Sequence, residues 1–165
     1  MSGTVTSHKV AVVTVSNSAS AGTADDTSGQ IAAERLTLLG FEVVHRLVIP
    51  DGADSVADTL RGIVDSVDLV VTTGGTGLSP TDQTPEGTLK VIDRNVPGLS
   101  EAMRAATFET VPFGKLSRGV SGLAGRCLIV NLPGSPKAVA EGLDVIGDVL
   151  DHAIAIATEE FGRHD

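Results

Sequence analysis

The chain has 165 residues, 41% of them hydrophobic and 20% charged, and this composition is typical of a soluble globular protein of one domain. Its formal net charge of −9 excludes nucleic acid as the main partner, because binding to a phosphate backbone requires a basic surface. The N-terminal segment is polar and no apolar run approaches the length of a membrane span, so we expect a cytoplasmic protein without membrane association.

Apolar runs and amphipathic stripes alternate along the chain. In chain order the pattern predicts a strand at 10–15, a helix at 27–39, a strand at 41–49 nearer the sheet edge, a helix from 54 to about 67, a strand at 68–72, helices at 85–93 and 100–107, a strand at 126–131, and a long helix after Ser135. Residues 110–125 have scattered prolines and glycines and predict no regular element. The alternation predicts an α/β fold in three layers, a mainly parallel sheet with helices on both faces. We expect a single domain over residues 1–165, with residues 1–8 flexible.

Local signals set several boundaries of these elements. Thr27 begins a Thr-x-x-Gln capping box, and Gly40 is placed to end the same helix. Asp54, with its neighbour serine, is expected to cap the second helix, and Thr84 and Ser135 are expected to cap two later helices, each with proline next in the chain. The single cysteine, Cys127, falls in an apolar run, which predicts a buried thiol rather than a nucleophile or metal ligand.

A glycine-rich loop joins the third predicted strand to a helix. Glycines at 74, 75 and 77 let backbone N–H groups approach an anion, and the following helix N-terminus favours the same anion. The loop is neither a Walker A motif, since no Gly-Lys-Ser/Thr follows, nor a dinucleotide fingerprint, since Pro80 replaces the third glycine. Asp82 would repel a bare phosphate, which favours Mg²⁺ bridging to phosphate oxygens. On spacing alone, a ligand-free turn remains the alternative.

Polar segments follow four of the predicted strands. Because ligands of such sheets bind outside the carboxyl ends of the strands, these segments should face one crevice. They are Ser16 to Ser18, Asp51, Thr72 to Asp82, and Asn131 to Ser135. Two carboxylates, Asp51 and Asp82, would then lie beside the glycine-rich loop, an arrangement that suits metal-assisted phosphoryl or nucleotidyl transfer. The alternative for Asp51 is an ordinary turn residue between Pro50 and Gly52.

Three motifs, in this order along the chain, resemble the molybdopterin-binding family. They are Thr72 to Gly77 with Asp82 to Glu86, Leu116 to Gly119, and Asn131 to Pro136. The resemblance spans nearly the whole chain and is nearest to the stand-alone, Mog-type adenylyltransferases. It implies molybdenum cofactor biosynthesis: adenylylation of molybdopterin with Mg-ATP, which releases pyrophosphate. Two alternatives are a non-catalytic, MoaB-like molybdopterin-binding protein and a molybdate-insertion domain, although the length leaves no room for the further domains of the latter.

The resemblance also implies roles for individual residues. The family's two important aspartates fall on Asp51 and Asp82, expected to be catalytic and to hold Mg²⁺. The implied nucleotide- or molybdopterin-binding positions are Ser16, Ser18, Thr73, Gly74, Gly75, Thr76, Gly77, Ser117, Arg118, Gly119, Pro133, Gly134 and Ser135. Arg118 is expected to pair with the molybdopterin phosphate, the alternative being a solvated surface arginine.

The expected partners follow from the same resemblance. They are molybdopterin, ATP with Mg²⁺ as cofactor, further copies of the chain in a homotrimer (a hexamer in the MoaB branch), and a molybdate-insertion enzyme. Trp and Tyr are absent and only four Phe are present, so no aromatic platform for a pterin or a base is expected. Recognition should rest on hydrogen bonds and the packing of small residues.

Overall fold

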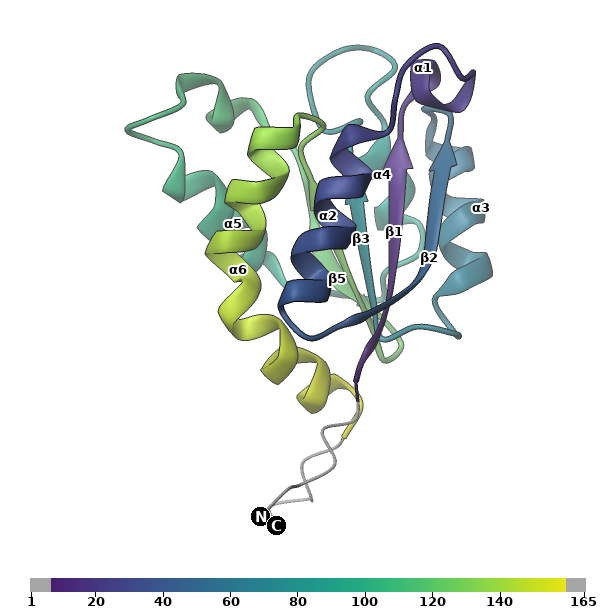
Figure 1. Cartoon of the computed structure of the whole chain (residues 1–165), viewed down its shortest axis with the longest axis vertical. Coiled ribbons are helices and arrows are strands. Elements are labelled where there is room, and N and C mark those ends of the chain that lie inside the picture. The colour runs from purple at the N-terminus through teal and green to yellow at the C-terminus, as the bar shows by residue number, and fades with distance from the viewer. Residues whose placement is uncertain (1–6, 160–165) are drawn as a thin grey trace.

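A computed structural model describes residues 7–159, which form a six-stranded sheet in the order β2-β1-β3-β6-β5-β4 (Figure 1). The strands are β1 Lys9–Val15, β2 Glu42–Ile49, β3 Leu69–Thr73, β4 Arg94–Asn95, β5 Ser121–Ala124 and β6 Cys127–Leu132. The four strands β2, β1, β3 and β6 are parallel, whereas β5 and β4 are antiparallel additions at one edge. The helices are α1 Asn17–Ser20, α2 Thr27–Leu38, α3 Ala53–Ile63, α4 Thr84–Leu89, α5 Pro97–Ala106, the 3-10 helix η1 Pro112–Leu116, and α6 Pro136–Ala157.

Helices cover both faces of the sheet. Successive residues of a strand point to opposite faces, so Val10 and Val12 of β1 pack into one core and Ala11 and Val13 into the other. The first core contains the apolar faces of α2 and α6, which lie side by side in Figure 1, and the second contains that of α3. The prediction of a three-layer α/β fold with a mainly parallel sheet is confirmed, as is the place of β2 at the sheet edge.

Helix α2 begins one residue earlier than the capping box predicts. Its N-cap is Asp26, whose Oδ1 accepts a hydrogen bond from the Gly29 N–H at 3.0 Å, so the predicted Thr27 cap is wrong. A carboxylate one residue upstream satisfies the free N–H of the first turn. The helix ends as predicted, because Gly40 adopts a φ of 97° and its N–H donates to the Thr37 carbonyl at 3.0 Å.

Helix α3 is capped from a distant part of the chain. Its N-cap, Gly52, has no side chain, and the free N–H of Ala53 donates to Gln83 Oε1 at 3.1 Å. The predicted cap at Asp54 and Ser55 is therefore wrong, because both residues lie inside the first turn. The hydrogen bond ties α3 to the loop that precedes α4.

The region without a predicted element contains η1 and β5. Strand β5 forms an antiparallel hairpin with β6 that turns at Gly125, which adopts a φ of 59°. Sequence reasoning also missed the short α1 and β4. Of the predicted flexible segment 1–8, residues 1–6 lie outside the described residues, whereas His8 is described and buried. Cys127 is buried as predicted, and burial raises the pKa of its thiol to about 12.

Between residues 7 and 159, the structure contains no helix with the length and apolarity needed to cross a bilayer. The cytoplasmic location stays a prediction.

Candidate functional site

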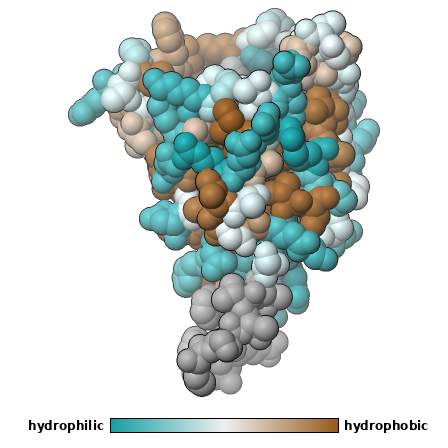
Figure 2. Space-filling model, viewed as in Figure 1, coloured by the Kyte–Doolittle hydropathy of each residue, from teal (hydrophilic) through white to brown (hydrophobic). Residues whose placement is uncertain are grey.

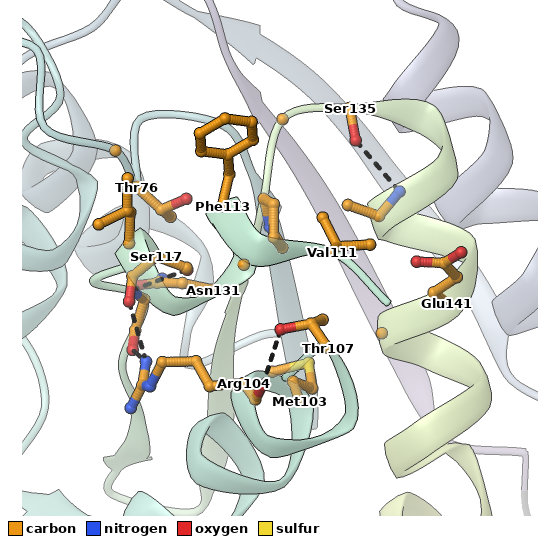
Figure 3. Close-up of a pocket in the computed structure, with 18 of the residues that line it drawn as sticks. Thr76, Met103, Arg104, Thr107, Val111, Phe113, Ser117, Asn131, Ser135 and Glu141 are labelled. Atoms are coloured by element: carbon orange, nitrogen blue, oxygen red, sulfur yellow. Dashed lines mark hydrogen bonds between the residues drawn. The ribbon is translucent and has the colours of Figure 1, made fainter. Parts of the chain in front are cut away.

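Two cavities open where the parallel strands end. The large cavity, of about 800 Å³, lies between the glycine-rich loop, α5, η1 and the start of α6 (Figure 3). The small cavity, of about 310 Å³, is lined by the segments that follow β1, β2 and β3. Gly75, Asp82 and Gly134 line both cavities, so the two meet at these residues. All four polar segments predicted to face one crevice contribute to this edge of the sheet.

The glycine-rich loop packs too closely for side chains at two positions. Gly74 has a φ of 91° and a Cβ there would overlap the carbonyl oxygen of Val15, whereas Gly75 has a φ of 70° and a Cβ would overlap the Thr84 hydroxyl. Thr84 donates through Oγ1 to the Gly74 carbonyl at 2.9 Å and through its N–H to the Gly75 carbonyl at 3.1 Å. Thr84 therefore holds the loop, and the prediction that it caps α4 is wrong, because the N-cap is Gln83.

The loop keeps backbone donors available for an anion. Among the described residues, none accepts a hydrogen bond from the N–H of Gly75, Thr76 or Gly77. These three residues line the large cavity. The loop therefore has the free donors that the predicted phosphate cradle requires.

The loop that follows β6 brings the N-terminus of α6 to the same place. Ser135 caps α6 as predicted, because its Oγ accepts a hydrogen bond from the Ala138 N–H at 3.1 Å. Pro133, Gly134 and Ser135 line the large cavity, so the N-terminus of a 22-residue helix begins at its wall. The partial positive charge of this terminus favours an anion near the junction of the cavities.

Asp51 and Asp82 both line the small cavity. Asp51 Oδ2 accepts a hydrogen bond from the Asn17 N–H at 3.2 Å, and Asp82 Oδ2 accepts one from the Ser79 N–H at 3.1 Å. Within residues 7–159, neither Oδ1 accepts a hydrogen bond. Each carboxylate is thus oriented by one oxygen and keeps the other for a ligand.

This donor set fits magnesium. Mg²⁺ binds through one or two carboxylates and completes its octahedron with water and substrate phosphates. In the described part of the chain, no cluster of three or more His, Cys, Asp or Glu side chains could form an all-protein metal site. Asp51 and Asp82 could therefore hold Mg²⁺ only together with a phosphate-bearing ligand.

A buried hydroxyl of the small cavity has no hydrogen-bond partner in the described part of the chain. Thr73 is 1% exposed, and its Oγ1 makes no hydrogen bond with any described residue. Burying an unpaired hydroxyl costs free energy, so Thr73 Oγ1 is suited to donate a hydrogen bond to an oxygen of a bound ligand. Ser16 and Ser18 line the same cavity with hydroxyl oxygens 3.2 Å apart, and Ser16 Oγ also accepts a hydrogen bond from the Ala19 N–H that caps α1.

Arg118 contacts the glycine-rich loop, and its pairing with the molybdopterin phosphate stays a prediction. Its Nε donates to the Gly77 carbonyl at 2.8 Å, its Nη2 donates to the Asp82 carbonyl at 2.6 Å, and its Nη1 pairs with Glu86. The hydrogen bond from Arg118 lowers the pKa of the Glu86 carboxyl, against the raising effect of burial. The guanidinium lines neither cavity, whereas its neighbours Ser117 and Gly119 line the large one. Arg118 therefore holds the loop that positions Asp82.

Sequence reasoning missed Arg104 on α5. It is the only cationic side chain that lines either cavity among residues 7–159. Its Nη1 donates to the Gly119 carbonyl at 2.8 Å and to the Ser117 carbonyl at 3.4 Å, and Figure 3 shows the side chain directed toward Ser117. Its Nε and Nη2 donate to no described residue, which leaves them for an anion. No sequence motif marks Arg104, since it is a basic residue within an amphipathic helix.

The structure also corrects the expectation that no aromatic platform exists. Phe113 of η1 lines the large cavity, although the residue is 78% exposed (Figure 3). A flat ring in the cavity can therefore meet an aromatic face. Residues 110–125 gave no sequence pattern that could have placed it.

Comparisons with known proteins agree with this architecture. The chain matches the family model described as "Probable molybdopterin binding domain" over residues 11–152. Molybdopterin adenylyltransferase of Escherichia coli K12 is 41% identical over 155 residues, covering 88% of this chain and 79% of the relative. The solved structure of the molybdopterin biosynthesis Mog protein from Mycobacterium ulcerans has 45% identity and a TM-score of 0.87, covering 92% of this chain and 99% of that one.

Two further relatives bear on function and on length. The molybdopterin biosynthesis enzyme MoaB from Thermus thermophilus has 42% identity and a TM-score of 0.87, covering 92% of this chain and 97% of that one. The Drosophila melanogaster molybdenum cofactor synthesis protein cinnamon is 36% identical over 153 residues, and the match spans 90% of this chain but only 25% of that protein. The family-model match covers residues 11–152, which include most of the described sheet and its loops. The chain therefore belongs to the molybdopterin-binding domain family.

Proposed function

We propose that this protein is a molybdopterin adenylyltransferase of molybdenum cofactor biosynthesis, which joins AMP from ATP to the terminal phosphate of molybdopterin. The observation that carries the proposal is the meeting of two chemically different cavities at Gly75, Asp82 and Gly134. A transfer between two substrates needs two binding sites that share one reaction point. The 41% identity to the Escherichia coli molybdopterin adenylyltransferase supports the same activity.

The large cavity takes molybdopterin. Apolar side chains from α5, η1 and α6 line it beside a few polar groups, which is the usual lining of a site for a flat organic ligand. Arg104 and the N-terminus of α6 supply positive charge for the terminal phosphate of molybdopterin.

The small cavity takes the triphosphate of ATP. Its lining is mainly hydroxyl groups, backbone and carboxylates. Thr73 Oγ1 donates to a phosphate oxygen, which satisfies the one side-chain atom that is buried without a partner within residues 7–159. The free N–H group of Gly75 holds a phosphate oxygen where the cavities meet, and the free N–H groups of Thr76 and Gly77 lie beside it at the wall of the large cavity.

The transfer needs little chemistry from the protein itself. An oxygen of the terminal phosphate of molybdopterin forms a bond to the α-phosphorus of ATP. The bond from that phosphorus to the oxygen bridging to the β-phosphorus breaks, and pyrophosphate leaves with the electron pair. No bond to the protein is formed, so positioning and charge neutralisation supply most of the acceleration.

Asp51 and Asp82 would hold Mg²⁺ through their free oxygens. The chemistry that the metal supplies when bound is neutralisation of the charge on the triphosphate and on the leaving pyrophosphate. Asp82 lines both cavities, so it contributes at the reaction point, whereas Asp51 lines only the small one.

A second candidate function is molybdopterin binding without transfer, in the manner expected of a MoaB-like protein. The similarity to the Thermus thermophilus MoaB structure, with a TM-score of 0.87, favours it as much as the Mog structure favours the transferase. The presence of both Asp51 and Asp82 favours the transferase. Release of pyrophosphate from ATP on addition of molybdopterin distinguishes them, because a binding protein releases none.

We also propose a homotrimer that hands its product to a molybdate-insertion enzyme. Exposed apolar side chains support self-association, and Figure 2 shows apolar patches between polar ones on the face formed by α2 and α6. On these two helices and at the α2 C-cap they are Leu38, Leu39, Val149 and Ile156. Light scattering at micromolar concentration should give three times the chain mass, and a monomer mass would contradict the proposal.

A further inference from the structure

One carboxylate of the large cavity has no role in the transfer described above. Glu141 lies on the second turn of α6, and its side chain is 47% exposed. Its contact with a described charged group is a solvent-exposed ion pair with Lys137, at 3.8 Å between Nζ and Oε1. Such an i,i+4 pair contributes little and leaves the carboxylate able to accept hydrogen bonds.

The other two carboxylates of the large cavity are committed elsewhere. Asp144 accepts a hydrogen bond from Arg35 Nη1 at 2.7 Å, which holds it toward α2. Asp82 lies where the cavities meet and is oriented by the Ser79 N–H. Glu141 is therefore the carboxylate that a ligand ring in this cavity can engage.

We propose that Glu141 selects the pterin ring of molybdopterin by accepting hydrogen bonds from its 2-amino group and its N3–H, while Phe113 covers one face of the ring. This inference rests on the proposed function, because it takes molybdopterin as the ligand of the large cavity. The 2-amino and N3–H groups form a planar pair of parallel donors, and two carboxylate oxygens match such a pair.

The same chemistry excludes adenine from this position. The corresponding edge of adenine has one donor, the 6-amino group, beside the N1 lone pair. A carboxylate facing N1 would repel it. Glu141 therefore assigns the ring of molybdopterin, and not the base of ATP, to the large cavity.

The placement of Glu141 also orients the substrate. In Figure 3, Glu141 projects from α6 on the opposite side of the cavity from Thr76 and Ser117. A ring held at Glu141 therefore directs the rest of molybdopterin toward the glycine-rich loop. That orientation brings the terminal phosphate toward Arg104 and the point where the cavities meet.

Phe113 supplies the apolar contact. Phe113 is 78% exposed, and covering an exposed phenyl ring with a stacked ligand is favourable because it removes apolar surface from water. Met103 of α5 and Val145 of α6 add further apolar side chains to the lining of the cavity. The ring is thus bounded by apolar groups on its faces and by Glu141 at its polar edge.

The test is titration of molybdopterin, without ATP, against the wild type, Glu141→Gln and Lys137→Gln. The Lys137 variant breaks the same ion pair but leaves the carboxylate, and Lys137 does not line the cavity, so it is the matched control. Losing one of two charge-assisted hydrogen bonds should weaken binding to Glu141→Gln roughly ten- to a hundredfold. The Lys137 variant should bind within about twofold of wild type.

A competition arm separates recognition from a general loss of shape. Pterin (2-amino-4-oxo) should displace molybdopterin from the wild type at lower concentration than lumazine (2,4-dioxo), which has an oxygen in place of the amino group. In Glu141→Gln this order should be lost or reversed, because the amide can donate to the 2-oxo group. Phe113→Leu should weaken both competitors without changing their order.

Three results would overturn the inference: molybdopterin affinity of Glu141→Gln within about twofold of wild type, an unchanged order of competitors, or equal losses in both glutamine variants. Because the titration contains no ATP, its outcome is independent of the transferase proposal. A wild type that binds through Glu141 but releases no pyrophosphate refutes only the transferase. A wild type that releases pyrophosphate with an unaffected Glu141 variant refutes only this inference.

Discussion

Removing the guanidinium of Arg118 should destabilise the glycine-rich loop. The side chain donates to the carbonyls of Gly77 and Asp82 and pairs with Glu86, and it is 35% exposed. A hydrogen bond to a charged group contributes roughly 1.5–3 kcal/mol, but partial exposure and shared partners make the three contacts less than additive. We therefore expect Arg118→Ala to lower the free energy of unfolding by roughly 2–4 kcal/mol.

The assay is urea or thermal unfolding at matched protein concentration, since any self-association makes the midpoint depend on concentration. Arg61→Ala is the control: its side chain is 55% exposed and pairs with Asp58 at 3.5 Å, so the change should stay within about 0.5 kcal/mol. Adenylyl transfer should also fall in Arg118→Ala, because the loop positions Asp82. Wild-type stability together with a selective loss of molybdopterin affinity would refute this reasoning and support the phosphate contact predicted from the sequence.

Four further predictions concern charge and protonation. Asp82→Asn keeps the size of the side chain but removes its charge. We expect this variant to fold and to bind molybdopterin, while its single-turnover rate of adenylyl transfer falls by at least roughly a hundredfold. A rate near that of the wild type would contradict the mechanism. Asp51→Asn should behave similarly, and the double variant should lose less than the product of the single effects if both carboxylates hold one metal. The pKa of Glu86 is lowered in the folded state, so its pairing with Arg118 stabilises the protein above the ordinary carboxyl pKa and is lost as pH falls through the folded value. The difference in unfolding free energy between wild type and Glu86→Gln should therefore shrink on acidification. A difference that stays constant would count against the pair. The raised pKa of Cys127, about 12, keeps its thiol neutral in the folded state, so the stability that the neutral thiol contributes is complete below the ordinary thiol pKa and fades as pH rises toward 12. At about pH 9, iodoacetamide should therefore alkylate Cys127 slowly in the folded protein and rapidly once urea unfolds the chain. Rapid alkylation of the folded protein would contradict the prediction, because it would show an accessible thiol.

The sheet and its loops could be predicted because their signals are local. Short β-branched runs marked the parallel strands, and the glycines after β3 marked a turn that only a residue without a side chain can make. The rule that ligands bind at the carboxyl ends of strands then brought Asp51 and Asp82 to one cavity, as the structure shows.

The remaining features depend on contacts between distant parts of the chain. Gln83 caps α3 across 30 residues, and Arg118 reaches Glu86 across 32, so neither partner can be inferred from sequence spacing. Arg104 and Phe113 line the large cavity because α5 packs against α6 and η1 packs against α5, and no periodicity in the sequence indicates that packing. For Arg118, the sequence motif indicated a functional residue, but its contacts with Gly77, Asp82 and Glu86 could be identified only from the structure.

The most direct test of the proposed reaction uses ATP labelled at the α-phosphorus, with molybdopterin, Mg²⁺ and the wild-type protein. Direct transfer predicts that the label enters molybdopterin as an adenylyl group, with one pyrophosphate released for each product and no label bound to the protein. Release of pyrophosphate without labelled molybdopterin would contradict it, as would label covalently attached to the chain or molybdopterin binding with no turnover of ATP.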